Sequence, residues 1–426
     1  TKYELNDYDF EKPSTSLTVK ETALTPKQTI DPLEVYAFPG KYAEKGDGTA
    51  RVLTRIEESE RDRTLYHGTS TCIAFSPGHT FTLKEHPSAA LNTDYQFRSV
   101  HTQVRDPWHF SEGKGEYLNE FVAAPKLSKF RPIQTTPRPR IYGLQSAVVV
   151  GKKGEEIWTD KHGRVKVQFH WDREGKKDEN SSCWIRVAQS WASKQWGGFI
   201  LPRLGMEVLV SFLDGDPDRP LVTGAVYNGE NKPPYPLPDN QTKSTLKSNS
   251  SKQGTGFNEI RFEDKTDEEE VFIHAQKEMN VETVKGDLHI TVGIDSPDPG
   301  DMTVDVMKGK FAETVHEGDM TVDVLKGQFD QSVKKDYTLK VEGNLTIEVT
   351  GDVTIKGKSI TLESTSSDVT IKAAANLKGT ATANVEMKGV SAKVEGSAAA
   401  ELKGGASAKV DGGGMAEVKG GVVKIN

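Results

Sequence analysis

The chain has 426 residues, a length that predicts two or three domains rather than one compact core. Its formal net charge is −7, so three copies would carry 3 × (−7) = −21, which disfavours binding to nucleic acid or anionic lipid. No apolar run reaches membrane-spanning length, no signal peptide opens the sequence, and the two cysteines, Cys72 and Cys183, lie far apart. These features favour assembly in a bacterial cytoplasm, with a lone disulfide left open.

We expect residues 1–135 to form a β-rich barrel or sandwich. Short alternating stretches between turn residues, such as 51–57 and 81–87, predict strands, and we find no helical pattern of useful length. The opening residues, TKYELNDYDF, read as the interior of a folded module, so we expect an upstream part of this domain to be missing.

Residues 136–230 predict a small closed barrel, reached through a proline-rich connector at 130–142. Turns rich in Gly, Asp, Asn and Pro separate the predicted strands, which lie at 145–151, on either side of 160–163, and at 182–190, 206–212 and 221–227. Five short strands in this arrangement are typical of an oligonucleotide/oligosaccharide-binding (OB) barrel.

The last third of the chain has a different composition. Residues 231–256 are polar and rich in Pro, Ser, Lys and Asn, which predicts a linker. In residues 257–426 no proline follows Pro299 and no aromatic residue follows Tyr337. A domain without large aromatic side chains must have a narrow interior.

An eight-residue repeat ends the chain, after two copies of GDMTVDV at 300–306 and 318–324. Alternation along a strand places three columns of small or aliphatic residues on one side and the charges on the other. The columns are Ala392, Ala400, Ala408 and Ala416; Val394, Leu402, Val410 and Val418; and Gly396, Gly404, Gly412 and Gly420. Glycine at fixed spacing predicts a corner in each octad.

Eight residues are too few to enclose a core in one coil of a single-chain β-helix. Three chains that each supply one short strand could close a triangular layer, so we predict an intertwined homotrimer with the Ala and aliphatic columns at its axis. Trimerisation would also remove unpaired strand edges. The alternative, low-complexity disorder, has no reason to keep three positional columns together.

Charged residues flank each aliphatic residue and alternate in sign from one octad to the next. The position before it holds Lys393, Glu401, Lys409 and Glu417, and the position after it holds Glu395, Lys403, Asp411 and Lys419. If octads of neighbouring chains stack, these columns form opposite-charge ladders that fix the register, each contact contributing about 0.2–1 kcal/mol.

The sequence resembles the VgrG (valine–glycine repeat) family, the tip spikes of bacterial type VI secretion systems, and is similar to the hub and needle of contractile phage tails. The stretches that carry the resemblance are YELNDYDFEKPS at 3–14, YQFRSVHTQV at 95–104, YGLQSAVVVG at 142–151, GRVKVQFHWDREG at 163–175, PRLGMEVLVSFLDGDPDRPLVTGAVYN at 202–228 and NEIRFEDK at 258–265. The resemblance covers nearly the whole chain, and together these motifs are highly specific.

The resemblance implies an all-β protein with a partial phage-hub-like β-barrel base, an OB-type barrel and a trimeric triple-stranded β-helix needle. It implies a secreted or injected, non-enzymatic spike that works with Hcp tube and baseplate proteins, a PAAR-repeat tip protein and separate effectors bound non-covalently. The chain ends directly after its repeats, so we expect no payload domain. Stacking stops at the last residues, where we expect the tip protein to dock: Gly420, Gly421, Val422, Val423 and Ile425.

We expect no catalytic residue, metal or cofactor. The run at 214–218 imitates a calcium loop but lacks the required glycine and final acid, and 170–172 have no nucleophile placed nearby by motif. The aromatic residues of the barrel predict a packed core and trimer contacts rather than a nucleic-acid platform; they are Trp158, Phe169, Trp171, Trp184, Trp191 and Trp196. The remaining alternative is a phage-type tail spike that binds or degrades surface carbohydrate, although the needle beyond Tyr337 has neither aromatic residues nor paired acids without neighbouring lysines.

Overall fold

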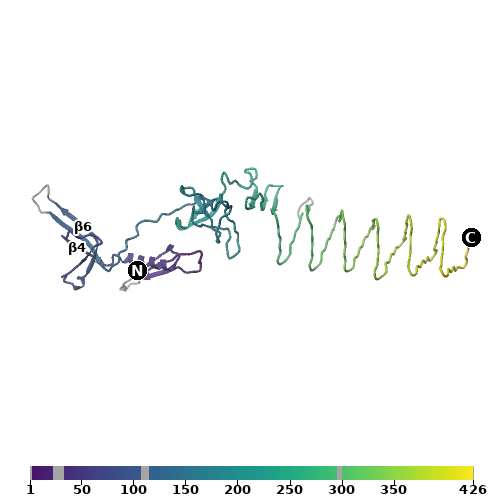
Figure 1. The fold of residues 1–426 in the computed structure, drawn as a ribbon, viewed down its shortest axis with the longest axis horizontal. Coiled ribbons are helices and arrows are strands. Elements are labelled where there is room, and N and C mark those ends of the chain that lie inside the picture. Colours follow the sequence, from purple (N-terminus) through teal and green to yellow (C-terminus); the bar gives the residue numbers. More distant parts are fainter. Residues whose placement is uncertain (1, 23–32, 107–114, 295–299, 426) are drawn as a thin grey trace. The chain divides into compact units, whose positions relative to one another are not determined.

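The computed structural model describes residues 2–22, 33–106, 115–294 and 300–425. The chain divides into two units, Thr1–Thr291 and Val292–Asn426 (Figure 1). The first unit contains every assigned strand and helix within the described residues, in four separate sheets.

The first sheet has the order β2-β1-β3 and is covered by the helix α1. Its strands are β1 (Lys2–Leu5), β2 (Val19–Thr22) and β3 (Glu34–Ala37), and α1 spans Lys45–Glu60. The helix packs on β1 and β2, where Leu5, Leu17, Val19, Tyr42 and Val52 form a buried cluster. This packing gives the short strands a core.

The helix corrects our expectation of a strand at 51–57. Gly48, Val52 and Ile56 are buried at intervals of four residues, the spacing of one helical face. The apparent period of two came from Val52, Thr54 and Ile56, but Thr54 is exposed. The two glycines in the first turn of the helix, at 46 and 48, favoured a non-helical interpretation, and tertiary packing outweighs their poor propensity.

The second sheet has the order β4-β7-β6-β5, with β4 (Tyr66–Ser70), β5 (Thr80–Thr82), β6 (Asp94–Arg105) and β7 (Glu116–Pro125). A short 3₁₀ turn, Ala89–Leu91, precedes β6. Aromatic rings form its core, with Phe75, Phe81, Phe97 and Phe121 in mutual contact at centroid distances of 4.4–5.9 Å. The strand expected at 81–87 is shorter than predicted and ends at Thr82.

The third sheet closes into the expected barrel. Its order is β10-β12-β11-β8-β9, with β8 (Gln145–Val150), β9 (Lys166–Phe169), β10 (Arg186–Val187), β11 (Glu207–Phe212) and β12 (Pro220–Val226). A 3₁₀ turn, Leu213–Gly215, joins the last two. Val165 and Ile185 exchange backbone hydrogen bonds of 2.9 and 2.8 Å that join the two edges of the sheet. Of the two strands expected around 160–163, only the second forms.

The barrel core consists of valine and isoleucine side chains and one alanine. Eight residues form one buried cluster: Ala147, Val149, Val165, Val167, Ile185, Val208, Val210 and Val222. They come from all five strands or their immediate flanks, as alternation inside a small barrel requires.

The fourth sheet, β13-β14-β15, partly contradicts the linker interpretation. Its strands are β13 (Lys243–Lys247), β14 (Glu259–Glu263) and β15 (Glu270–His274), all antiparallel. The first strand lies within the expected linker 231–256, because its backbone pairs with β14 despite its polar composition. The boundary expected at 256 falls inside this hairpin.

The second unit is an extended, bending chain (Figure 1). Within residues 300–425 no strand is assigned, and every side chain is exposed. Bends or turns begin at 397, 405, 413 and 421, each one residue after a glycine of the octad column. The strands that we expected there have no backbone partner in a single chain, so the octads alternate in sequence without forming a ladder.

Candidate assembly surface

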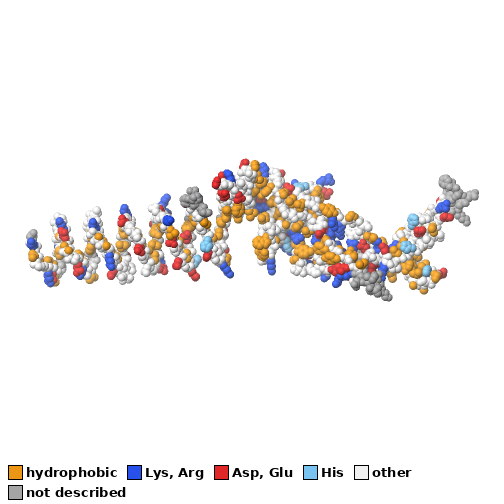
Figure 2. Space-filling view, turned by 180° about the vertical axis from the view of Figure 1, so that it is seen from behind, with side chains coloured by type: hydrophobic (Ala, Val, Ile, Leu, Met, Phe, Trp, Pro, Cys, Tyr) orange, Lys and Arg blue, Asp and Glu red, His pale blue; other side chains and the backbone are white. Residues whose placement is uncertain are grey.

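The aliphatic column of the octads is open to solvent. Val394, Leu402, Val410 and Val418 are 74–79% exposed, and the four column alanines are also exposed. Figure 2 shows hydrophobic side chains at the surface throughout this unit, between charged ones. Isolated apolar side chains at a surface need no explanation, but a column that recurs every eight residues indicates a surface that another chain covers.

The backbone of this unit also lacks partners. Among residues 300–425, the backbone–backbone hydrogen bonds outside regular elements are those from the amides of Gly414 and Met415 to Gly412. Backbone amides and carbonyls in a folded protein are nearly always paired once apolar surface packs around them. An extended chain that pairs with none of its own coils can bury its apolar column only by pairing with other chains.

The charged columns share one side of the chain, opposite the aliphatic column. Lys409 Nζ lies 3.0 Å from Asp411 Oδ2 across Val410, and the equivalent pairs Lys393–Glu395 and Glu417–Lys419 are also in contact. The hydrogen bond from Lys409, with another from the Gly413 amide, lowers the pKa of Asp411. In one chain the charges thus pair within an octad; the ladder between chains, including Glu401 and Lys403, stays a prediction.

Three column glycines occupy positions where a side chain would not fit. A Cβ at Gly396, Gly404 or Gly412 would lie 2.0–2.2 Å from the carbonyl oxygen three residues later. These contacts make each corner tight. Gly420 has more room, because its nearest neighbour would lie 3.5 Å away.

The last residues expose apolar side chains without a partner. Val422 and Ile425 are 78% and 91% exposed, Val423 is half exposed, Gly420 precedes the bend and Gly421 begins it. The aliphatic column is equally exposed, so the docking role that we expected for Gly420, Gly421, Val422, Val423 and Ile425 stays a prediction.

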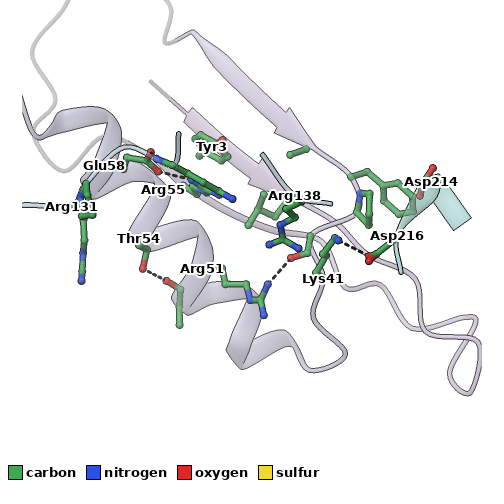
Figure 3. Close-up of a pocket in the computed structure, with 18 of the residues that line it drawn as sticks. Tyr3, Lys41, Arg51, Thr54, Arg55, Glu58, Arg131, Arg138, Asp214 and Asp216 are labelled. Carbon is green, nitrogen blue, oxygen red and sulfur yellow. Dashed lines mark hydrogen bonds and ion pairs between the residues drawn. The ribbon is translucent and has the colours of Figure 1, made fainter. Parts of the chain in front are cut away.

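A polar cavity of about 760 Å³ lies in the first unit, between α1, the first sheet and the connector (Figure 3). Sequence reasoning did not find it, because its residues are scattered from Tyr3 to Asp216. Six basic residues line it: Lys41, Arg51, Arg55, Arg131, Arg138 and Arg140. Three acidic residues, Glu58, Asp214 and Asp216, also line it.

Most of these charges already have partners. Lys41 Nζ lies 2.5 Å from Asp216 Oδ2, Arg55 Nη1 lies 2.6 Å from Glu58 Oε2, and Arg51 donates to the Gly40 carbonyl. The Lys41–Asp216 pair joins the segment before α1 to the barrel turn, and the Gln134 amide on the connector donates to Glu58 Oε1 on the helix at 2.9 Å. Asp216 accepts hydrogen bonds from Lys41 and from the Asp218 amide and is buried, so 214–218 form a turn, but the carboxylate of Asp216 is not solvated as the sequence suggested.

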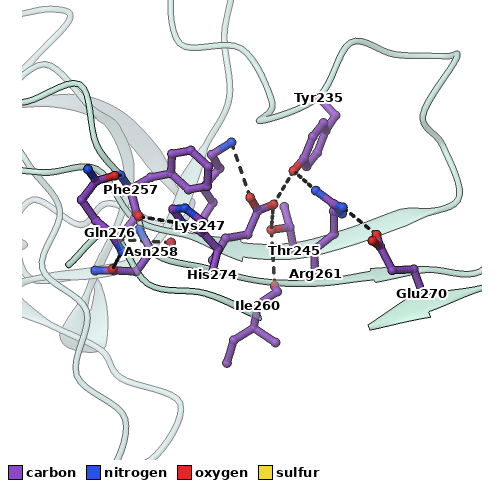
Figure 4. A network of polar contacts seen from close by, with 12 residues as sticks. Tyr235, Thr245, Lys247, Phe257, Asn258, Ile260, Arg261, Glu270, His274 and Gln276 are labelled. Carbon is purple, nitrogen blue, oxygen red and sulfur yellow. Dashed lines mark hydrogen bonds and ion pairs between the residues drawn. The ribbon is translucent and has the colours of Figure 1, made fainter. Parts of the chain in front are cut away.

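A network that sequence reasoning also missed lies on one face of the fourth sheet (Figure 4). The buried Glu259 carboxylate accepts hydrogen bonds from Tyr235 Oη at 2.5 Å and from Thr245 Oγ1 at 2.8 Å, and Lys247 Nζ lies 3.6 Å away. Arg261 donates to Tyr235 Oη at 2.8 Å and to Glu270 at 2.6 Å. The network fastens the segment around Tyr235 to β14. Its only sequence signal is the alternation in NEIRFEDK.

The expected packing role of the aromatic residues in the barrel is only partly correct. Trp158 and Trp184 stack at 6.4 Å, but Trp171, Trp191 and Trp196 are 65%, 64% and 56% exposed. The core is complete with small aliphatic side chains, so these three rings stay at the surface; their place in trimer contacts stays a prediction. Trp171 donates to Gln145 Oε1 and Asp172 caps the Glu174 and Gly175 amides, which is a turn and not an acid–base pair.

Within the residues that the structure describes, no three His, Cys, Asp or Glu side chains gather to hold a metal ion. In that same part of the chain no helix is long and apolar enough to cross a membrane. Cys72 and Cys183 are both exposed and unpaired, so the disulfide left open by the sequence does not form here.

Three family models match consecutive parts of the chain. Residues 1–108 match the phage tail baseplate hub, 147–227 the type VI secretion system/phage-baseplate injector OB domain, and 244–357 the bacteriophage T4 gp5 C-terminal trimerisation domain. The matches follow the order hub, barrel and needle expected from the sequence.

The similar curated proteins include type VI secretion system spike proteins of Pseudomonas aeruginosa. VgrG1b is 44% identical over 292 residues, which are 67% of this chain and 39% of the relative. VgrG1a is 44% identical over 296 residues, which are 68% of this chain and 45% of the relative. The actin cross-linking toxin VgrG1 of Vibrio cholerae is 38% identical over 305 residues, 68% and 28%. The matched region thus spans less than half the length of each relative.

Among solved structures, the E. coli c3393 protein is described as a component of the type VI secretion system with structural similarity to T4 bacteriophage tail proteins gp27 and gp5. The structural match covers 43% of this chain and 44% of the c3393 chain, with 24% sequence identity and a TM-score of 0.31.

Proposed function

Because the chain belongs to the VgrG family of type VI secretion spike proteins, we propose that three copies form the spike of such a system. The spike stands on a tube of Hcp and contacts baseplate proteins. It carries a PAAR-repeat protein at its needle end and delivers separate effectors bound non-covalently. It assembles in the cytoplasm and is then driven out of the cell into a target. Its action is mechanical: it pierces the target cell and carries effectors into it.

The proposal rests on the second unit, whose apolar side chains and backbone groups have no partner within one chain. Residues 300–425 expose an aliphatic column and an unpaired extended backbone, and the trimerisation family model covers 244–357. Two further copies of the chain would cover the aliphatic column at a shared apolar axis. They would also provide strand partners for the backbone.

We assign no catalytic role to the described residues. The Vibrio cholerae relative is described as an actin cross-linking toxin, but the match spans 28% of its length, so the likeness concerns a shared part of that protein. The comparisons do not favour a tail spike that acts on carbohydrate, since the curated relatives above are described as secretion spikes or as an actin cross-linking toxin.

The test is the mass of the purified full chain by light scattering, combined with a pull-down from the producing cell. We expect a particle of three chains, with tube, tip or effector proteins in the pull-down. A monodisperse monomer would overturn the proposal. Turnover in a screen against cell-surface glycans would replace it with the carbohydrate alternative.

A further inference from the structure

The fourth sheet exposes the face that a small sheet normally buries. In the register of β13, β14 and β15, Leu246 pairs with Ile260 and Ile260 with Ile273, while Phe262 pairs with Val271. Residues paired in this way lie on one face, and all five of these side chains are 44–66% exposed. Glu259, on the opposite face, is only 3% exposed.

The opposite face is already occupied by the chain itself. Tyr235 lies over it and contacts Glu259 and Arg261, whereas Ile260 points away from that network (Figure 4). The described part of the chain therefore covers the polar face and leaves the apolar face free. Five large apolar residues on a three-stranded sheet form a patch that needs a partner.

The partner best suited to this face is another copy of the same chain. The sheet lies almost entirely within residues 244–357, the stretch that matches the trimerisation family, so its apolar face is continuous with the region expected to assemble. The face carries Ser244 and aliphatic or aromatic residues but no charge. Identical copies can thus meet there around a threefold axis without like-charge repulsion.

The octads cannot set the register of three chains by themselves. A shift by one octad opposes like charges, but a shift by two octads (410 − 394 = 16 residues) restores every column: Lys393 takes the place of Lys409, Glu395 that of Asp411, and Val394 that of Val410. Within residues 392–420, only the residues lost at each end tell the two alignments apart. A repeat of this kind leaves register weakly specified.

We infer that the apolar face of the β13–β15 sheet is the surface through which three chains associate first, and that it fixes the register of the octads. Its five residues differ in size and do not recur at octad spacing, so one alignment alone packs them together. The inference rests on the proposed trimer and adds the place where the trimer is specified.

The experiment uses the full chain with Cys72→Ser and Cys183→Ser. Two differently tagged forms, one with Val394→Cys and one with Val410→Cys, are co-expressed and oxidised. With the native sheet we expect disulfides only between like forms, because positions 394 and 410 lie two octads apart. The double variant Ile260→Asp/Phe262→Asp should either lose the mass of a trimer or yield disulfides between unlike forms.

The matched control is Glu270→Gln, which changes the other face of the same sheet and should leave mass and disulfide pattern unchanged. Tryptophan fluorescence checks that the first unit, which we also call the head, stays folded, since all six tryptophans lie at or before Trp196. Deletion of residues 397–412, which removes two octads, should leave a trimer.

The outcomes separate the two proposals. A monomeric native chain overturns the proposed function. A native trimer whose Ile260→Asp/Phe262→Asp variant keeps both trimer mass and like-only disulfides overturns the present inference alone. Loss of the trimer on deleting 397–412 also overturns it, because association would then depend on the octads.

Discussion

Two buried carboxylates, Glu57 and Glu259, fasten segments that carry little apolar packing of their own. Glu57 on α1 is 3% exposed and binds Lys129 Nζ at 2.6 Å and Arg131 Nε at 2.7 Å, which ties the connector to the helix. Glu259 does the same for the segment around Tyr235. Burial raises the cost of each charge, so the partners must be present for the carboxylate to be stable.

We predict that Glu57→Gln destabilises the first unit by about 1.5–3 kcal/mol at neutral pH, the range for hydrogen bonds to a charged group. The hydrogen bond from Lys129, together with Arg131 and against the opposing effect of burial, lowers the pKa of Glu57 below its ordinary value of 4.5. The stabilisation is therefore complete above about pH 4.5 and is lost as the pH falls through the lower folded-state pKa.

Urea unfolding at pH 7 and pH 3 measures this effect. The Gln variant should lose stability at pH 7 and depend less on pH between the two values. Glu44→Gln is the control, because Glu44 forms only an exposed pair with Lys12. Equal effects of the two substitutions would refute the role given to Glu57.

In the octads, we expect a charge substitution to destabilise the needle more in the aliphatic column, which faces the axis, than in the charged columns, which face solvent. Lys409→Glu should cause a small fall in the thermal stability of the needle that added salt relieves, because the position is exposed and screened. Val410→Asp should bury an unpaired carboxylate at the axis of each chain and cost on the order of several kcal/mol, with little relief from salt. Thermal unfolding at low and high salt distinguishes them, and the reverse order would mean that the two faces are assigned the wrong way round.

At the scale of elements, local pattern and tertiary packing compete most where glycine is present. The helix α1 forms although glycines stand in its first turn, because Val52 joins the buried cluster of the first sheet and Ile56 is fully buried. In the octads the glycines have the opposite role. Close approaches of the backbone require glycine at Gly396, Gly404 and Gly412.

We predict that Gly404→Ala destabilises the needle by about 1–3 kcal/mol per chain, the usual cost of forcing extra atoms into occupied space. The new Cβ would lie 2.0 Å from the Ser407 carbonyl oxygen. Gly405→Ala is the matched control, since nothing lies within 4 Å of its Cβ. Thermal unfolding of both full-length variants checks the pair, and a Gly405 variant as unstable as the Gly404 variant would remove the close-approach argument.

At the scale of the whole molecule, the head and the needle obtain their stability in different ways. The first unit has cores of its own, in the barrel and beneath α1. The second unit has none within the residues described and depends on other copies. A change at the far end of the needle should therefore leave the head intact.

We predict that deletion of residues 420–426 abolishes binding of the tip protein while the chain stays trimeric and the head stays folded. The deletion removes the exposed Val422, Val423 and Ile425 that offer an apolar platform at the end of the stack. A pull-down with the tip protein, with light scattering and tryptophan fluorescence as controls, measures the three properties. Unchanged capture of the tip protein would show that docking lies elsewhere.

The sequence by itself determined the features that repeat or alternate. The barrel strands 145–151 and 206–212 and the octad columns could be predicted because side-chain period follows directly from backbone geometry. It also determined the family, through stretches such as GRVKVQFHWDREG that are specific as strings.

Only the tertiary structure decided the helix at 45–60, the strand inside the expected linker, the charged cavity and the network of Glu259. Each depends on residues far apart in sequence, such as Lys41 with Asp216 or Tyr235 with Glu259, and no local period records such a pairing. The same reason explains why the apolar face of the fourth sheet went unnoticed. Leu246, Ile260 and Ile273 become one surface only when three strands pair in one register.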